Sequence, residues 1–437
     1  MTDDAVVPAA VDAEVFPESG LSGDEIRATL VDLHKGDIDW RGGKAFSLVY
    51  HSDDEALEAL LHDVGVMFLH ENALNPFKYP SLVQMEAEVV AKGAALFHTE
   101  PKAGTMSSGG TESIFLAVHT ARSHGEKERG ITAPNIVTAD TAHPAFAKAC
   151  HYLRIEHRRV PVGADLRADV AAMEAIIDDD TILVVGSSPC YPYGVIDPIP
   201  ELAAMAADRG VLMHVDGCLG GWLLPWWEQL GEPVPPWDFR VPGVTSLSAD
   251  IHKYGYSFKG ASLVLYRDPA MVQHQWFLYD DWPGGLYGSV TSAGTRPAAP
   301  IAGAWATIAF LGQEGYRHKA RQVRDATRGF QAGIGGIEGL AIHGEPDLSV
   351  FEFGVPLGEA GSSEAGGAVD IGGVGDLMDD RGWNLDRQPG GLHLMVSPYH
   401  VHMVDQFIAD LADAVAQHGA SRGKAASYGG IADIDAP

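Results

Sequence analysis

The stretch SADIHKYG (residues 248–255) places Lys253 directly after a histidine, between small residues and a Tyr-Gly pair. Strand-like runs at 244–248 and 262–266 flank it. A lysine is normally a solvated surface charge, but burial among these apolar and aromatic neighbours would lower the pKa of Lys253. A primary amine that loses its proton near neutral pH can form an imine. We therefore interpret Lys253 as a candidate nucleophile.

Strand-like and helix-like segments alternate on the N-terminal side of this stretch. Such alternation is typical of an α/β domain in which helices cover both faces of a mixed, mainly parallel sheet. Polar groups at the carboxyl ends of the strands then gather at one edge of the sheet. The predicted strands are 135–138, 181–186 and 211–215, and the predicted helices are 112–123, 143–152 and 201–209.

The two ends of the chain differ from this middle part. We predict a helical, partly flexible N-terminal segment (1–70), a large domain (71–310), a small C-terminal α+β domain (311–420) and a disordered tail (421–437). Ser22 is the predicted cap of the first helix. The Gly- and Ser-rich stretch 356–376 is predicted to be a loop, and 392–397 a strand with one solvated face. The other predicted helices are 21–35, 53–70, 81–96, 301–330 and 401–417, and the other strands are 340–342 and 348–353.

Charge and composition argue against several classes of protein. The 437 residues carry 30 Lys+Arg and 59 Asp+Glu, a formal net charge of −29, which disfavours binding to nucleic acid or to anionic membranes. The apolar stretch 297–313 is short for a bilayer span and contains two prolines, so we expect no stable membrane insertion. The acidic N-terminus resembles no signal peptide. Cys150, Cys190 and Cys218 lack metal-ligand spacing, so we expect a cytoplasmic protein without a metal site.

Three further motifs could complete a site around Lys253. SSGGTES (107–113) opens a helical run, where Gly109 and Gly110 would let backbone N–H groups approach an anion. His143 follows a predicted strand, and its imidazole could lie flat over an aromatic ring. Asp216 ends another strand and could keep a ring nitrogen protonated, which turns the ring into an electron sink. Each feature also has an ordinary structural explanation as a helix start or a cap.

The order of these motifs along the chain indicates that they form one cofactor-binding site. An anion cradle, a stacking group, an acid and a buried lysine, in this order, are the parts that pyridoxal phosphate requires. We therefore predict this cofactor. His252 and Ser248 could reach its phosphate, and Lys259 supplies a second cation near the pocket.

With these residues in place, the sequence resembles the sphingosine-1-phosphate lyase family, a branch of the group II pyridoxal-phosphate decarboxylases with the type I aminotransferase fold. The resemblance runs from about residue 42 to residue 402. The motifs that carry it are SSGGTES, GSSPCYPYGVID (186–197), VDGCLGGWLLP (215–225), SADIHKYGYSFKG (248–260), YGSVTSAGTRP (287–297) and GEPDLSVFEFG (344–354).

The resemblance implies a role for each cofactor residue. Lys253 would form the imine with the cofactor, Asp216 would pair with the pyridine nitrogen, and His143 would stack on the ring. The residues that would hold the phosphate are Gly109, Gly110 and Thr111, helped by His252.

The resemblance also implies substrate residues and a partner. Tyr191 and Lys259 match residues that the family uses near the reacting substrate, and Tyr50 is a further candidate. Gly294 and Thr295 would reach the phosphate site of the partner subunit, so the active unit would be a homodimer with a shared active site.

One stretch departs from the family pattern. The family usually shows an Asn-Pro-Leu-His-Pro-Asp-like sequence before Phe-Pro, whereas residues 72–80 read NALNPFKYP. Asn75 replaces a histidine that helps to bind the substrate phosphate, and Phe77 replaces the acid. The substrate therefore stays open between a phosphorylated 2-amino-3-hydroxy lipid, cleaved by a carbon–carbon lyase, and a free amino acid, decarboxylated at its α-carbon. Arg296 or Arg381 would bind the amino acid. An inactive scaffold is the third alternative.

Overall fold

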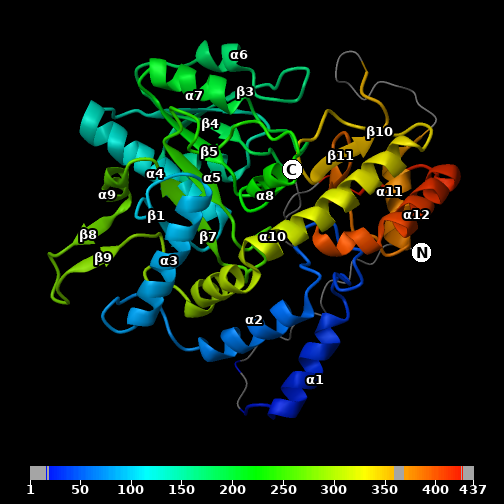
Figure 1. Ribbon diagram of the computed structural model, residues 1–437, viewed down its shortest axis with the longest axis horizontal. Helices are drawn as coiled ribbons and strands as arrows, with labels where there is room; N and C mark the ends of the chain where they lie inside the picture. Colours follow the sequence, from blue (N-terminus) through cyan, green and yellow to red (C-terminus); the bar gives the residue numbers. More distant parts are fainter. Residues whose placement is uncertain (1–15, 17–18, 359–368, 425, 427–437) are drawn as a thin grey trace.

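The computed structural model describes residue 16, residues 19–358 and 369–424, and residue 426, and every structural statement below refers to these. Two main β-sheets, each with a hydrophobic core, account for most of the fold (Figure 1). The expectations for residues 1–15, for 359–368 and for 427–437 lie outside the described residues.

The larger sheet has seven strands in the order β1-β7-β6-β5-β4-β2-β3. Strands β2 to β6 run parallel to one another, whereas β7 is antiparallel to both β6 and β1. This arrangement confirms the predicted mixed, mainly parallel α/β sheet. The strands are β1 Gly104–Ser107, β2 Asn135–Ala139, β3 Glu156–Val160, β4 Thr181–Ser187, β5 Leu212–Asp216, β6 Ser246–Ala249 and β7 Ser262–Tyr266.

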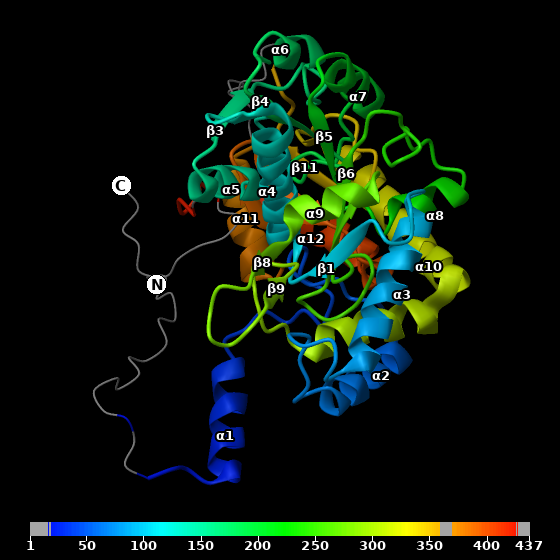
Figure 2. The ribbon, with the colours of Figure 1, turned by 90° about the vertical axis from the view of Figure 1, so that its left-hand side faces the viewer.

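Helices cover both faces of this sheet, with α3 and α4 on opposite sides in Figure 2. On β4, Val184 packs in one core cluster with Leu202 of α7, whereas its neighbour Val185 packs in another with Phe146 of α5. A strand that is buried on both faces needs apolar residues at successive positions, which explains the run TILVVG. The helices are α3 Pro80–Leu96, α4 Gly110–Arg129, α5 Ala145–Leu153, α6 Val170–Glu174, α7 Ile199–Asp208, α8 Leu224–Gln229 and α9 Val272–Gln275.

The smaller sheet is antiparallel, in the order β10-β11-β13-β12. Its core contains Phe351 and Leu394 of the sheet, Phe407 of α12 and, from near the start of the chain, Phe46. Phe46 is fully buried, and its N–H donates to the carbonyl of Asn384 at 3.1 Å. The elements are β10 Ala341–Ile342, β11 Val350–Gly354, β12 Asp386–Gln388, β13 Gly391–Met395, α11 Ile371–Asp380 and α12 Val404–Gln417.

Helix α10 (Ala298–Gly335) connects the two cores (Figure 1). Its first part contributes Ile301 to the larger core, and its last part contributes Phe330 to the smaller one. At Gly312 the backbone leaves the helical conformation, with φ 52° and ψ −172°. The predicted boundary between the domains falls within this helix and stays a prediction. Neither α10 nor any other described helix has the length and apolar composition that a membrane span requires.

The N-terminal helices α1 (Gly23–His34) and α2 (Glu55–Met67) lie close to their predicted positions. The predicted cap of α1 is confirmed: Ser22 Oγ accepts from the Glu25 N–H at 3.2 Å, and the Glu25 carboxylate accepts from the Ser22 N–H at 2.7 Å. Within the described part of the chain, no residue of α1 is buried, and Figure 2 shows the helix standing apart from the sheets. Its exposed apolar side chains are Ile26, Leu30, Val31 and Leu33.

A second exposed apolar element is the hairpin of β8 (Phe277–Tyr279) and β9 (Tyr287–Ser289), which extends away from the larger sheet (Figure 1). Monomeric proteins seldom expose clusters of large apolar side chains, so both α1 and this hairpin are candidates for contact with another chain. The exposed side chains in and beside the hairpin are Trp276, Phe277, Leu278, Tyr279, Trp282 and Leu286.

Two expectations about the C-terminal region are wrong. Residues 371–376, expected to be loop, belong to α11, because the Asp370 carboxylate accepts from the Gly373 N–H at 3.0 Å and caps the helix. Strand β13, expected to have a solvated face, is buried throughout. It is an interior strand of its sheet, and its His393 packs against Tyr191 of the larger domain at 4.3 Å between ring centroids.

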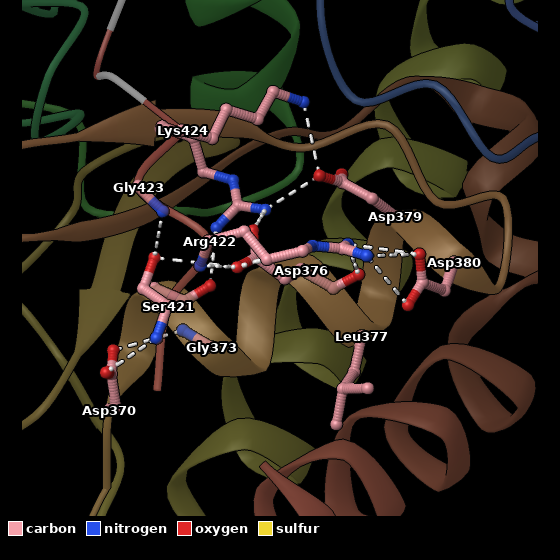
Figure 3. A network of polar contacts seen from close by, with 12 residues as sticks. Asp370, Gly373, Asp376, Leu377, Asp379, Asp380, Ser421, Arg422, Gly423 and Lys424 are labelled. Atoms are coloured by element: carbon pink, nitrogen blue, oxygen red, sulfur yellow. Dashed lines mark hydrogen bonds and ion pairs between the residues drawn. The ribbon is translucent and has the colours of Figure 1, made fainter. Parts of the chain in front are cut away.

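The first residues of the predicted disordered tail are held against α11 (Figure 3). The Arg422 N–H donates to Asp376 Oδ2 at 2.6 Å, and its guanidinium donates to the Asp380 carboxylate at 3.0 Å. Lys424 pairs with Asp379 at 3.2 Å. The prediction of disorder is therefore wrong for 421–424, because these charges anchor the segment.

Candidate active site

Lys253 lies in the turn that follows β6. Its Nζ is 3.0 Å from Oδ2 of Asp250, whose side chain is 2% exposed. Burial alone would raise the pKa of Asp250, but the charges of Lys253 and His252, with a hydrogen bond from Ser262, lower it. Asp250 is therefore a buried carboxylate that fixes the lysine. Its role was not predicted from the sequence, although it lies within residues 248–255.

Asp216, the last residue of β5, points into the same region. Its Oδ1 accepts from the Cys218 N–H at 3.1 Å and from the Ser248 hydroxyl at 3.3 Å. Strand register explains the second contact, because Ser248 is paired with Asp216 across β5 and β6. Ser248 also hydrogen-bonds His214 at 3.1 Å. It therefore supports Asp216 and does not line the cavity at the start of α4, where the sequence analysis expected it to reach a phosphate.

His143 lies just before α5 and lines the cavities around Lys253 and Asp216. Its Nδ1 accepts the Ala145 N–H at 3.1 Å, which fixes the ring. Burial, followed by the positive charge of Lys253, lowers the pKa of His143 more than the nearby carboxylates raise it. The imidazole is therefore neutral at pH 7 and suited to packing on an aromatic ring.

The start of α4 forms a cradle opposite Lys253. Gly109 has φ 156°, and a Cβ on Gly110 would lie 2.7 Å from Asp250 Oδ2 and 2.9 Å from Cys218 Sγ. The cradle is anchored by Glu112, which accepts the Ser108 N–H at 2.7 Å. A helix N-terminus of this kind binds phosphate through its free N–H groups and its dipole. The cavity, of about 300 Å³, is lined by Ser108, Gly109, Gly110, Thr111, Glu112, Ile114, His143, Cys218, Asp250, His252 and Lys253.

These groups fit pyridoxal phosphate. The cradle matches an anion, Asp216 can hold a proton on a ring nitrogen, and the amine of Lys253 lies between them. His252 lies beside the cradle, with Nε2 3.5 Å from Asp250 Oδ2. Burial lowers the pKa of His252 to about 4. The imidazole is therefore neutral at pH 7 and lies beside the cradle as a hydrogen-bonding group.

Lys259 and Tyr50 stand together beside this cavity. The Lys259 ammonium is 4.9 Å from the centre of the Tyr50 ring and donates to the carbonyl of His252 at 3.3 Å. Although the residue is exposed in the single chain, the protein packed around its ammonium and the charge of Lys253 lower the pKa of Lys259 to about 8. A substantial fraction of the amine is therefore neutral at mildly alkaline pH.

Tyr191 follows β4 and reaches the smaller sheet. It lines the cavity that contains Lys253 and Asp216, and its hydroxyl donates a hydrogen bond to Asp386 of β12. The predicted substrate residue thus lies at the contact between the two sheets. Asp386 carried no sequence signal, because it meets Tyr191 only through the fold.

The remaining predicted residues lie elsewhere in the single chain. Asn75, Gly294 and Arg296 line a separate cavity of about 580 Å³, and Thr295 beside them is exposed. The Arg296 guanidinium binds both oxygens of Glu86, at 2.7 and 2.8 Å. Arg381, the other candidate for binding an amino acid, pairs with Asp413 at 2.5 Å. Both arginines are therefore already engaged by carboxylates.

The described residues contain no cluster of three or more His, Cys, Asp or Glu side chains that could hold a metal ion.

A family model described as the pyridoxal-dependent decarboxylase conserved domain matches residues 46–353, which include Lys253, Asp216 and the cradle. The chain belongs to the pyridoxal-dependent decarboxylase family. It is therefore a pyridoxal-phosphate-dependent lyase.

Several relatives in this family are similar over most of the chain. Sphingosine-1-phosphate lyase of Oryza sativa subsp. japonica is 42% identical over 92% of this chain and 74% of its own length. Sphingosine-1-phosphate lyase 1 of Rattus norvegicus is 37% identical over 92% of this chain and 70% of its own. A probable L-aspartate decarboxylase of Pyrococcus abyssi is 30% identical over 92% of this chain and 99% of its own.

Solved structures of pyridoxal-dependent decarboxylases and lyases share the fold. The sphingosine-1-phosphate lyase of Burkholderia pseudomallei superposes with a TM-score of 0.86 and 37% identity, over 94% of this chain and 95% of that one. Glutamate decarboxylase of Lactobacillus brevis superposes with a TM-score of 0.78 and 21% identity, over 92% of this chain and 94% of that one. These matches confirm the type I aminotransferase fold and the resemblance to sphingosine-1-phosphate lyases.

Proposed function

We propose that the protein is a carbon–carbon lyase that cleaves the Cα–Cβ bond of a phosphorylated 2-amino-3-hydroxy substrate, releasing an aldehyde and a phosphorylated amine such as phosphoethanolamine. The main support is the arrangement of Tyr191, which lines the cavity that contains Lys253 and Asp216, and of Lys259, which stands with Tyr50 beside it. Decarboxylation requires no base to deprotonate a substrate hydroxyl, whereas cleavage between Cα and Cβ does. The similarity to sphingosine-1-phosphate lyases supports the same reaction.

Each residue of the site has a defined task in this reaction. Bound pyridoxal phosphate supplies the electron sink for the pair of the broken bond. The amine of Lys253 would hold the cofactor, and Asp216 would hold a proton at its pyridine nitrogen. Neutral His143 would lie against the ring, and the cradle of Gly109, Gly110 and Thr111 would bind the phosphate.

We also propose that two chains share each active site in a cytoplasmic homodimer. Gly294 lines a different cavity from Lys253 of its own chain, and Thr295 is exposed. The exposed apolar side chains of α1 and of the β8–β9 hairpin would be covered by a second subunit. In this arrangement Asn75 stands near the partner's site and binds the substrate phosphate through its amide. The free, buried state of all three cysteines fits a reducing compartment.

Amino-acid decarboxylation is the second candidate. The Pyrococcus abyssi relative favours it, whereas the pairing of Arg296 with Glu86 and of Arg381 with Asp413 disfavours it. In these pairs, neither arginine offers an open guanidinium to a substrate carboxylate.

Product mass spectrometry distinguishes the two reactions. The purified protein, loaded with pyridoxal phosphate, is offered a phosphosphingoid base and, in parallel, a panel of free amino acids. We expect a fatty aldehyde and phosphoethanolamine from the first and no product with Lys253→Ala. An amine one carboxyl group lighter than a supplied amino acid, with the sphingoid base intact, would overturn the lyase proposal and establish decarboxylation.

A further inference from the structure

Contacts from the smaller sheet converge on Tyr191. The Tyr191 hydroxyl donates to Asp386 of β12. His393 of β13 hydrogen-bonds the Tyr191 carbonyl through Nε2 at 2.9 Å, and the two rings lie 4.3 Å apart. A carbonyl only accepts hydrogen bonds, so Nε2 of His393 carries the proton. Both the backbone and the ring of Tyr191 are therefore held by the C-terminal part of the chain.

Tyr191 separates two cavities. It lines the cavity that contains Lys253 and Asp216, and it also lines a cavity of about 460 Å³ between the two sheets, whose wall includes Asp386. His143 lines both cavities as well. Tyr191 thus lies where the active site meets the smaller sheet, and the carboxylate that its phenol binds comes from the far side of that boundary.

The direction of the hydrogen bond determines what Tyr191 can do. The phenol donates to the Asp386 carboxylate, so its proton points toward Asp386 and its oxygen would meet a substrate hydroxyl as an acceptor. We infer that Asp386 acts through Tyr191: it orients the phenol and receives the phenol proton when Tyr191 takes the proton of the substrate's 3-hydroxyl group. This inference rests on the proposed lyase reaction.

The proton transfer balances. The substrate hydroxyl gives its proton to the Tyr191 oxygen while the Tyr191 proton passes to the Asp386 carboxylate. The former O–H pair forms the second carbon–oxygen bond of the aldehyde, and the pair of the Cα–Cβ bond stays with Cα. A proton then returns to Cα, so the reaction consumes no oxidant, reductant or net proton. Lys259, beside the cavity, is left to bind the substrate rather than to deprotonate it.

A double-mutant cycle tests whether Asp386 acts through Tyr191. The variants are Asp386→Asn, Tyr191→Phe and the double variant, with Asp410→Asn as a matched control. Asp410 is another carboxylate of the smaller domain, and it accepts from the indole of Trp383 at 2.8 Å. Single-turnover aldehyde release gives the cleavage rate, and the absorbance change of the cofactor on addition of substrate amine gives binding independently of cleavage.

General bases typically contribute about 10²- to 10⁴-fold, so we expect Tyr191→Phe to lower the cleavage rate about 100-fold or more. Asp386→Asn is expected to lower it about 10- to 100-fold, with KM and the absorbance change nearly unaltered and partial recovery in Asp386→Glu. The double variant is expected to be no slower than Tyr191→Phe, and Asp410→Asn to match the wild type.

Any of four other results would overturn the inference. If the losses in cleavage rate of the two single variants multiply in the double variant, Asp386 does not act through Tyr191. A change in Asp386→Asn that is confined to KM would show the same. An Asp386→Asn protein that cleaves at the wild-type rate would have the same meaning. If the wild-type protein releases no aldehyde from any phosphorylated 2-amino-3-hydroxy compound, the proposed function itself is wrong, and the inference is overturned with it.

Discussion

Replacing Gly110 by alanine should reverse the usual effect of this substitution in a helix. Alanine normally stabilises a helix relative to glycine by up to about 1 kcal/mol. At Gly110, the first residue of α4, the added Cβ would lie 2.7 Å from Asp250 Oδ2 and 2.9 Å from Cys218 Sγ, both on buried side chains. Overpacking of this kind costs about 1–3 kcal/mol. We therefore expect Gly110→Ala to lower the free energy of unfolding by about 1 kcal/mol.

The same clash should weaken cofactor binding, because Asp250 can move only by displacing Lys253, its partner at 3.0 Å. A cost of about 1.4 kcal/mol in the bound state raises the Kd for pyridoxal phosphate tenfold. The thermal midpoint of the apoprotein and a cofactor titration by absorbance measure the two effects. Gly335→Ala in the last turn of α10 is the control, since its added Cβ meets no described atom within 4 Å beyond its chain neighbours and its own helix backbone; it should raise the midpoint and leave the Kd unchanged. If Gly110→Ala behaved like this control, the packing argument for the cradle would be refuted.

Three further predictions concern single side chains. Because Lys259 binds the substrate as an ammonium group, kcat/KM for carbon–carbon cleavage should fall as pH increases through about 8, where Lys259 loses its proton, and a pH–rate profile of Lys259→Arg should lack this fall. Burial lowers the pKa of His343, but the hydrogen bond to Glu352, 2.6 Å away, raises it above the ordinary value. The stability from this pair is present below about pH 6.5 and is lost as the pH rises through the folded-state pKa of His343. The thermal midpoint of the wild type should therefore decrease over that pH range, and the decrease should be smaller in Glu352→Gln. Asp376→Asn should release the segment around Arg422, which limited trypsin digestion would detect as faster cleavage after Arg422; unchanged cleavage would show that the other ion pairs suffice.

The sequence predicted the interior of the larger sheet well. The run at β4 is apolar at successive positions because both faces of the strand are buried. Strand β3, with the sequence EHRRV, was missed because it is an edge strand whose charged side chains reach solvent. The polar capping pattern of Ser22 and Glu25 was also readable, since both partners lie within one helical turn.

The candidate site was predicted where its chemistry lies in local motifs. Lys253, Asp216, His143 and the cradle all follow strand ends or start helices, so their neighbours in the sequence reveal them. The contact of Tyr191 with Asp386 joins residues that are 195 positions apart, and no local pattern indicates it. Ser248 was assigned to the phosphate from its place in the motif. Its contact with Asp216 depends on the pairing of β5 with β6, which the motif does not reveal.

The position of Phe46 has a consequence for how the chain is made. A ribosome releases this residue well before its ring partners Phe330, Trp383 and Phe407. Strand β1 likewise cannot pair until β7 has been synthesised. Until then the nascent chain carries unsatisfied apolar surface around Phe46, so the smaller core cannot form before α12 has been synthesised, and products that terminate before α12 should be substrates for chaperones and proteases.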